Sequence, residues 1–163
     1  MTERWVINAS PIIVLAKIDS TWLLEELADK IIVPQAVVDE INAGPVNDPA
    51  RKFLATSPWP IANVRVNSVV QAWDLGSGET SVLSYALVHG GWKAVIDDAA
   101  ARKCAHTLNI PTMGTLGVIL KARKKGLIPE AAPLLKAIKS HGFRLSDHII
   151  SQALKMFLDE DWP

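Results

Sequence analysis

Residues 5–18 read Trp-Val-Ile-Asn-Ala-Ser-Pro-Ile-Ile-Val-Leu-Ala-Lys-Ile. The first three residues form a short apolar run, which predicts a buried β-strand. Ser10 and Pro11 then supply a helix N-cap and a proline at the first helical position, and apolar residues typical of a helix follow. A strand that passes directly into a helix is the repeating unit of an α/β protein.

The rest of the chain repeats this alternation. Short apolar runs bounded by turn residues predict further strands at 31–33, 64–66 and 94–96, with a candidate fifth strand at 110–113. Helical patterns begin at Pro34 and Ser77 and cover 99–108, 116–125, 130–140 and 146–158. The proline-rich segment 44–60 is expected to be an excursion with a short helix at 50–55. We therefore predict one domain over residues 1–163, a three-layer α/β/α sandwich with a mainly parallel central sheet.

Composition limits the classes of protein to consider. The hydrophobic fraction is 49%, which is enough for a packed core, and 17 basic residues balance 17 acidic ones. This balance excludes a strongly basic protein that coats nucleic acid through its net charge, but it permits a local basic groove. A single cysteine, Cys104, excludes an internal disulfide and a cysteine-rich zinc site. Without an apolar run of about 20 residues, we expect no membrane span. We expect a cytoplasmic protein.

Acidic and amide side chains follow the predicted strands. Asn8 ends the first strand, and Asp97 and Asp98 end the strand at 94–96. Glu79 falls in the first turn of one helix, and Glu40 lies about two turns into another. Each has an ordinary role when taken alone, as a cap, a dipole partner or a solvated charge. Right-handed crossovers, however, bring the carboxyl ends of parallel strands to one edge of the sheet. Convergent oxygen ligands of this kind favour a Mg²⁺ site.

Four segments together resemble a known family. They are Val6–Ile18, Gly76–Glu79, Ile96–Asp98 followed by Ala101–Arg102, and Gly114–Val118. This combination resembles a PIN domain, and more narrowly the small prokaryotic PIN-like subgroup related to the toxins of type II toxin–antitoxin pairs. The resemblance runs from Val6 to about Gly142 and beyond. It implies an α/β/α nuclease that cuts RNA with Mg²⁺ or Mn²⁺ held by acidic residues.

The resemblance also assigns roles to residues. The first-strand acid of the family falls on Asn8, the second on Glu40 and the third on Glu79. The last acid falls on Asp97 or Asp98. The resemblance therefore implies that these five side chains hold the metal and that the four acids among them are catalytic.

Two further residues and the partners follow from the same comparison. Ser10 matches a hydroxyl residue that supports the metal site, and Arg102, one turn after Asp98, is a candidate contact to substrate phosphate or an ion-pair partner of the nearby acids. The implied partners are RNA, a small antitoxin and a second copy of the chain. Surplus tryptophan, with Trp22 or Trp59 at the surface, agrees with a homodimer.

Asn8 is the one departure from the family pattern, because Asp is usual at this position. An amide offers a carbonyl oxygen but no charge, so metal affinity is expected to fall. Two functions therefore stay open: an endoribonuclease toxin, or a catalytically impaired PIN-like module that binds RNA or a partner. A receiver-type phosphoacceptor is disfavoured, because Asn67 follows the strand at 64–66 and no lysine directly follows 110–113.

A basic run near the end of a predicted helix has two interpretations. Lys121, Arg123, Lys124 and Lys125 precede Gly126. They either complement the helix dipole or form a track for RNA phosphates.

Overall fold

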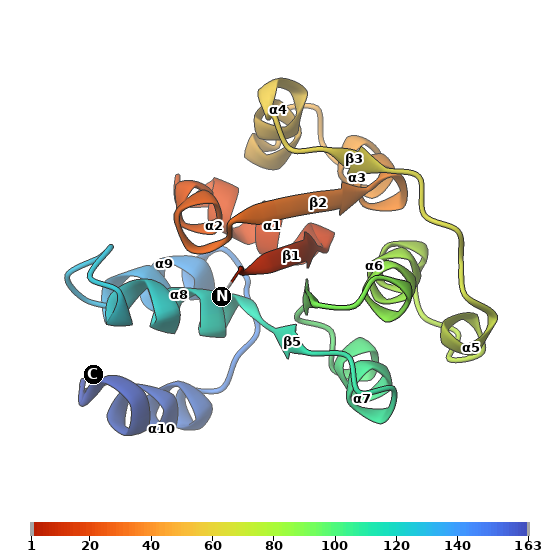
Figure 1. Ribbon diagram of the computed structural model, residues 1–163. Coiled ribbons are helices and arrows are strands. Elements are labelled where there is room, and N and C mark those ends of the chain that lie inside the picture. The colour runs from red at the N-terminus through yellow and green to blue at the C-terminus, as the bar shows by residue number, and fades with distance from the viewer. Residues whose placement is uncertain (1, 163) are drawn as a thin grey trace.

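The computed structural model describes residues 2–162, which form five strands and ten helices (Figure 1). The strands are β1 (Arg4–Ile7), β2 (Lys30–Pro34), β3 (Ile61–Ala62), β4 (Trp92–Val95) and β5 (Thr112–Met113). They form one sheet in the order β3-β2-β1-β4-β5, and every neighbouring pair is parallel. The predicted α/β class with a parallel sheet is therefore confirmed.

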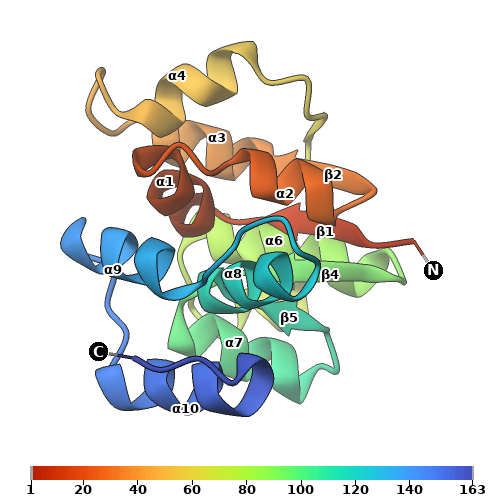
Figure 2. The ribbon, with the colours of Figure 1, turned by 90° about the vertical axis from the view of Figure 1, so that its left-hand side faces the viewer.

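Helices cover both faces of this sheet. They are α1 (Ala9–Lys17), α2 (Trp22–Leu27), α3 (Gln35–Asn42), α4 (Pro49–Thr56), α5 (Ser68–Gln71), α6 (Ser77–Val88), α7 (Ala99–Thr107), α8 (Thr115–Lys124), α9 (Ala132–Ser140) and α10 (Asp147–Leu158). One face carries α1, α2 and α8, with α9 and α10 outside them, and the other carries α3, α6 and α7 (Figures 1 and 2). This arrangement is the predicted three-layer sandwich. None of the helices in residues 2–162 has the length and apolar composition needed to cross a bilayer.

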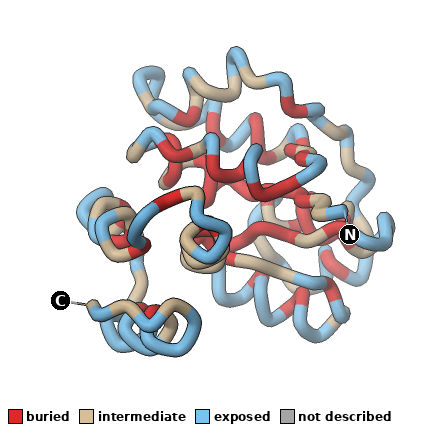
Figure 3. Tube along the Cα trace, turned by 60° about the vertical axis from the view of Figure 1, so that its left-hand side comes forward, coloured by how far each residue is buried: buried red, intermediate tan, exposed pale blue. Residues whose placement is uncertain are grey.

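The core lies around β1, the central strand. Trp5, Val6 and Ile7 have no exposed surface, and Figure 3 shows the buried residues gathered along the inner strands and the helix faces against them. Because helices cover both faces, a central parallel strand is apolar throughout rather than alternating. This explains why the run at 5–7 is such a clear strand signal.

The predicted strand at 64–66 is wrong. The edge strand β3 lies earlier, and its last pair joins Ala62 to Pro34, where β2 ends. Proline has no N–H to continue the ladder, and α3 starts at the next residue. Residues 64–66 therefore have no strand beside them and run unpaired toward α5. The short helices α2 and α5 are also absent from the sequence prediction.

The strand order fixes where the chain reverses its direction across the sheet. From β1 it passes outward through β2 to β3, then returns to β4 and β5 on the other side of β1. This switch point lies at the carboxyl ends of β1 and β4, where open α/β sheets form their binding crevices. The Asn8 amide N–H donates to the Val95 carbonyl at 3.0 Å, so the two strand ends are tied together directly.

Candidate active site at the switch point

A cavity of about 440 Å³ opens at the switch point. Its lining includes Asn8, Ser10, Glu79, Asp97 and Asp98, which come from both strand ends and from the first turns of α1 and α6. The expectation that these side chains meet at one edge of the sheet therefore agrees with the structure. The cavity's lining does not include Glu40, whose side chain approaches the same region at Gly78 of α6.

Asn8 is the most unusual of these residues. It occupies the N-cap position of α1, is only 3% exposed, and its side-chain oxygen Oδ1 has no hydrogen-bond partner within residues 2–162. An unpaired buried acceptor costs free energy that folding must offset elsewhere. The orphaned oxygen at the mouth of a crevice is therefore a position where an external ligand would be stabilised.

Gly78 leaves room beside that oxygen. A Cβ atom at Gly78 would lie 3.0 Å from Asn8 Oδ1 and 3.1 Å from Glu40 Oε1. The two oxygens therefore flank one small space, which any other residue at this position of α6 would fill. Through this space the Glu40 carboxylate, although Glu40 is the sixth residue of α3, comes close to Asn8.

Like charge accumulates around this space. Burial of the carboxyl group raises the pKa of Glu40, and the negative charge of Glu79 raises it further, although Glu40 as a whole residue is exposed. Glu79 lies in the first turn of α6, where the helix dipole favours an acid. The charge of Glu79 thus opposes the ionisation of Glu40, and a cation bound between the two side chains would stabilise this arrangement.

Asp97 is held much more firmly than the two glutamates. Its Oδ1 accepts the Thr115 N–H at 2.7 Å, and its Oδ2 accepts the Thr115 hydroxyl at 2.7 Å and the Ser10 hydroxyl at 3.2 Å. Ser10 thus supports the site through Asp97. Thr115, fully buried at the start of α8, was not among the predicted site residues, although it lies in the Gly114–Val118 segment that carries the family resemblance.

Asp98 has a capping role. Its side chain accepts the Ala101 N–H at 2.9 Å and so closes the first turn of α7. Of the two candidates for the last acid, Asp97 is therefore the one tied to Ser10, while Asp98 serves its own helix from the cavity rim.

Arg102 lies beside Asp97 without pairing to it. A Cβ atom at Gly114 would lie 2.8 Å from an Arg102 terminal nitrogen and 2.9 Å from Asp97 Oδ1. Within the described chain, however, Arg102 forms no ion pair. Its guanidinium stays exposed near the acids and available to an anion.

The donor set suits a hard cation that keeps much of its water. In residues 2–162, no three or more His, Cys, Asp or Glu side chains are grouped so that they could hold a metal by themselves. Mg²⁺ commonly binds through one or two carboxylates and several waters, so it does not need such a group. The orphaned Asn8 Oδ1, the Gly78 space and the Glu40–Glu79 pair fit that mode of binding.

Two other interpretations of the sequence, the basic run as an RNA track and Trp59 as a surface residue, do not agree with the structure. Lys121 pairs with Glu3 at 2.7 Å and Arg123 with Glu160 at 3.7 Å, so these members of the basic run are already neutralised and do not line the acidic cavity. Trp59 is buried and donates to Glu25, which makes its assignment to a dimer surface wrong.

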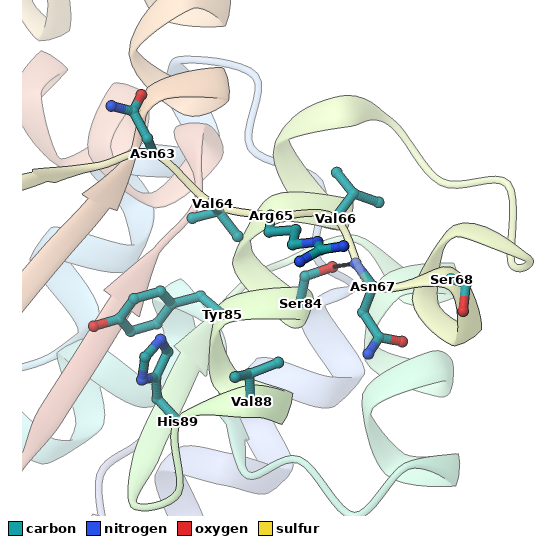
Figure 4. Close-up of a pocket in the computed structure, with 10 residues that line it drawn as sticks. All are labelled: Asn63, Val64, Arg65, Val66, Asn67, Ser68, Ser84, Tyr85, Val88 and His89. Carbon is teal, nitrogen blue, oxygen red and sulfur yellow. Dashed lines mark hydrogen bonds between the residues drawn. The ribbon is translucent and has the colours of Figure 1, made fainter.

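A larger cavity of about 530 Å³ lies elsewhere, between residues 63–68 and the second half of α6 (Figure 4). Figure 4 shows Tyr85 and His89 side by side in it, with ring centroids 4.2 Å apart, and Arg65 on the opposite strand-like segment. No carboxylate of residues 2–162 lines this cavity, so it lacks the ligands that the smaller one supplies.

The comparison with protein families agrees with the geometry. The family DUF3368, described as a PIN domain, matches residues 4–158, and the chain therefore belongs to this family. No curated protein matches the chain. The PIN domain is a nuclease-type fold, so the match gives the class of the protein and leaves its particular activity to be argued from the site.

Proposed function

We propose that this protein is a Mg²⁺- or Mn²⁺-dependent endoribonuclease that serves as the toxin of a toxin–antitoxin pair. The observation that carries the proposal is the buried, unpaired Asn8 Oδ1, which faces the Glu40 carboxylate across the space left by Gly78. The PIN-domain family supports the nuclease class.

Each side chain has a definite task in this proposal. Asn8 Oδ1, Glu40 and Glu79 hold the cation, which when bound lowers the pKa of water and neutralises charge on the phosphate. Asp97 forms the inner wall of the site, and hydrogen bonds from Thr115 and Ser10 hold its carboxylate in place.

The remaining two residues act at the rim. Arg102 contacts the substrate phosphate, and Asp98 caps α7 so that Arg102 keeps its place one turn later.

Proton linkage follows from the raised pKa of Glu40. A ligand carboxyl must lose its proton before it binds a cation, so metal affinity rises as pH increases through that pKa. Cleavage should therefore fall on the acid side more steeply than it would with an ordinary glutamate.

A second function is favoured by one observation, the amide at position 8. With one charge fewer beside the cation, the chain would bind RNA or a protein partner on a nuclease scaffold without cutting. The two functions differ in whether the wild-type protein cleaves RNA.

The direct test is cleavage of end-labelled single-stranded RNA with Mg²⁺ or Mn²⁺ and with EDTA. Wild type should cut only with metal. Glu79→Gln should lose at least a hundredfold in rate, roughly the size of one removed electrostatic contact in an active site. Glu26→Gln is the matched control, because Glu26 is exposed on α2 and lies outside the cavity. Metal-independent cleavage, or equal rates in wild type and Glu79→Gln, would overturn the proposal.

The proposal includes assembly and location. We infer a homodimer and a small antitoxin partner in the cytoplasm, supported by exposed apolar side chains such as Trp22, which is 43% exposed. Light scattering should give twice the 17.7 kDa chain mass, and a monomer at tens of micromolar protein would contradict the dimer.

A further inference from the structure

The wall of the switch-point cavity that faces the acids comes from a distant part of the chain. It is formed by the outer face of α1, ending at Lys17, and by residues 141–144, which connect α9 to α10. Figure 2 shows α9 beside α1, with the connection to α10 descending from it. The crevice therefore has a carboxylate side and an opposite side that carries Lys17, His141 and Arg144.

The cations of this wall are free. Lys17 and Arg144 are exposed, and in the part of the chain that the structure describes neither forms an ion pair or a side-chain hydrogen bond. They share a cavity with Glu79, Asp97 and Asp98 yet stay unpaired. Lysine and arginine placed in this way are suited to contact anionic oxygens of a ligand.

The connection is also held in place at both ends. At the end of α9 the Phe143 N–H donates to the Ile138 carbonyl at 3.1 Å and the Gly142 N–H donates to the Lys139 carbonyl at 3.0 Å. With Gly142 at φ +90°, this is a Schellman motif. At the other end the Ser146 side chain caps α10 by accepting the Ile149 N–H at 3.1 Å.

Between these two ends, Phe143 and Leu145 pack against the core. Arg144 lies between these anchors, so its backbone position over the cavity is set by the fold. A loop fixed in this way loses little conformational freedom when it binds a ligand, which favours affinity.

We propose that Lys17 and Arg144 form a phosphate-binding wall that holds the backbone of single-stranded RNA against the acidic side of the cavity. This inference rests on the proposed function and names its substrate-gripping residues. The charges explain the choice of ligand: four acids repel a phosphodiester, and a chain with no net charge offers no general attraction, so local cations must supply it. Arg102 contacts one phosphate of the RNA from the acidic side, and Lys17 and Arg144 of this wall contact the phosphates next to it.

The test is RNA binding rather than cleavage. The affinity of a short, fluorescently labelled single-stranded RNA is measured by anisotropy in EDTA, over a range of salt concentrations. Lys17→Ala and Arg144→Ala should each weaken binding severalfold and reduce the slope of log K against log[salt] by about 0.7, the value for one lost contact to single-stranded nucleic acid. Arg144→Lys keeps the charge and should keep the slope.

Two controls define the result. Arg65→Ala removes an exposed cation at the other cavity and should leave affinity and slope unchanged. Inorganic phosphate as competitor should displace the RNA only weakly if several adjacent phosphates are gripped together, and strong displacement would overturn the backbone assignment.

The outcomes separate the inference from the proposed function. If wild type binds RNA through Lys17 and Arg144 but cleaves it with neither Mg²⁺ nor Mn²⁺, the wall stands and the nuclease proposal fails. If wild type cleaves RNA while both alanine variants bind like Arg65→Ala, the wall is wrong and the nuclease proposal stands. Absence of RNA binding by wild type overturns the wall as well.

Discussion

The two ends of β1 differ in whether the acidic and polar side chains beside them have partners. Just before the strand, Glu3 accepts a hydrogen bond from Lys121 at 2.7 Å and another from the Trp5 indole N–H at 3.0 Å, with Lys93 at 3.6 Å. These contacts, the Lys121 bond foremost, lower the pKa of Glu3 to about 2. The charges of Glu3, Lys121 and Lys93 are therefore paired with one another.

At the other end of the same strand, Asn8 and Glu40 lack such partners within residues 2–162. Asn8 Oδ1 is buried and unpaired, and the pKa of Glu40 is raised by burial and by Glu79. At neutral pH, therefore, the ionised Glu3 carboxylate at the amino end stabilises the folded state, whereas the ionised Glu40 carboxylate at the carboxyl end destabilises it. Under the proposed function, the amino edge stabilises the fold, while the carboxyl edge would bind a cation and its substrate.

The largest expected effect comes from adding a charge to the unpaired end. Asn8→Asp keeps the side-chain shape and supplies a charged ligand oxygen, so we expect Mg²⁺ affinity to rise about tenfold, equivalent to about 1.4 kcal/mol. Without metal the new carboxylate opposes Glu40 and Glu79 and should lower the melting temperature. Thermal unfolding with and without Mg²⁺ measures both changes. Asn63→Asp is the control, because Asn63 is exposed directly after β3 and does not line the switch-point cavity, and an equal Mg²⁺ shift in the two variants would contradict the site.

Removing the charge at the paired end should cost stability. Glu3→Gln weakens the charged hydrogen bond from Lys121 and should lower the free energy of unfolding by about 1–2 kcal/mol at neutral pH. The folded pKa of Glu3 lies below its ordinary value of 4.5, so its contribution is present above pH 4.5 and is lost as pH falls through about 2. Urea unfolding of wild type and variant should therefore converge near pH 2. A constant difference at all pH values would show that charge is not the cause.

The substitution Glu40→Gln, on the opposite edge, should change the stability of the fold in the opposite direction. The folded pKa of Glu40 lies above its ordinary value of 4.5, so the carboxylate opposes folding at neutral pH and ceases to do so below 4.5. In EDTA, Glu40→Gln should raise the melting temperature slightly at neutral pH and leave it unchanged near pH 4. The gain is small because Glu40 is exposed. A lower melting temperature at neutral pH would instead make Glu40 part of a stabilising contact.

The smallest effect on stability is expected at Gly78. Alanine there improves helix propensity by at most about 1 kcal/mol, because Gly78 lies in the first turn of α6. Its Cβ comes closest to the ends of the Asn8 and Glu40 side chains, of which Glu40 is exposed, and makes an ordinary contact with Val37 at 3.6 Å. We expect a stability change within about 1 kcal/mol together with clearly weaker metal binding in calorimetry. Gly90→Ala, where a Cβ meets nothing within 4 Å, is the matched control. Unchanged metal binding in Gly78→Ala would show that the space beside Asn8 is not used.

How far the sequence predicts this molecule depends on how local each feature is. The strands at 5–7 and 31–33 are apolar runs with sharp boundaries, and both lie within β1 and β2. Parallel topology then places Asn8, Glu79 and Asp97 at one cavity without further information. These features need only periodicity and the handedness of crossovers.

Other features depend on tertiary contacts that no local pattern records. The edge strand falls at 61–62 because β2 ends at Pro34, not because 64–66 lacks β-propensity. Thr115 reaches Asp97 only because α8 begins beside the end of β4. The wall at 141–144 lies more than a hundred residues from α1 in sequence and meets the site through the packing of α9 on α1 and of Phe143 on the core.

The most direct test of the contrast between the two ends of β1 is calorimetric titration of Mn²⁺ into wild type, Glu79→Gln and Glu3→Gln at neutral pH. We predict that wild type and Glu3→Gln bind Mn²⁺ with the same affinity, while Glu79→Gln binds at least tenfold more weakly. Equal binding by all three proteins, or loss of binding in Glu3→Gln alone, would contradict the assignment of the cation site to the carboxyl end of the strand.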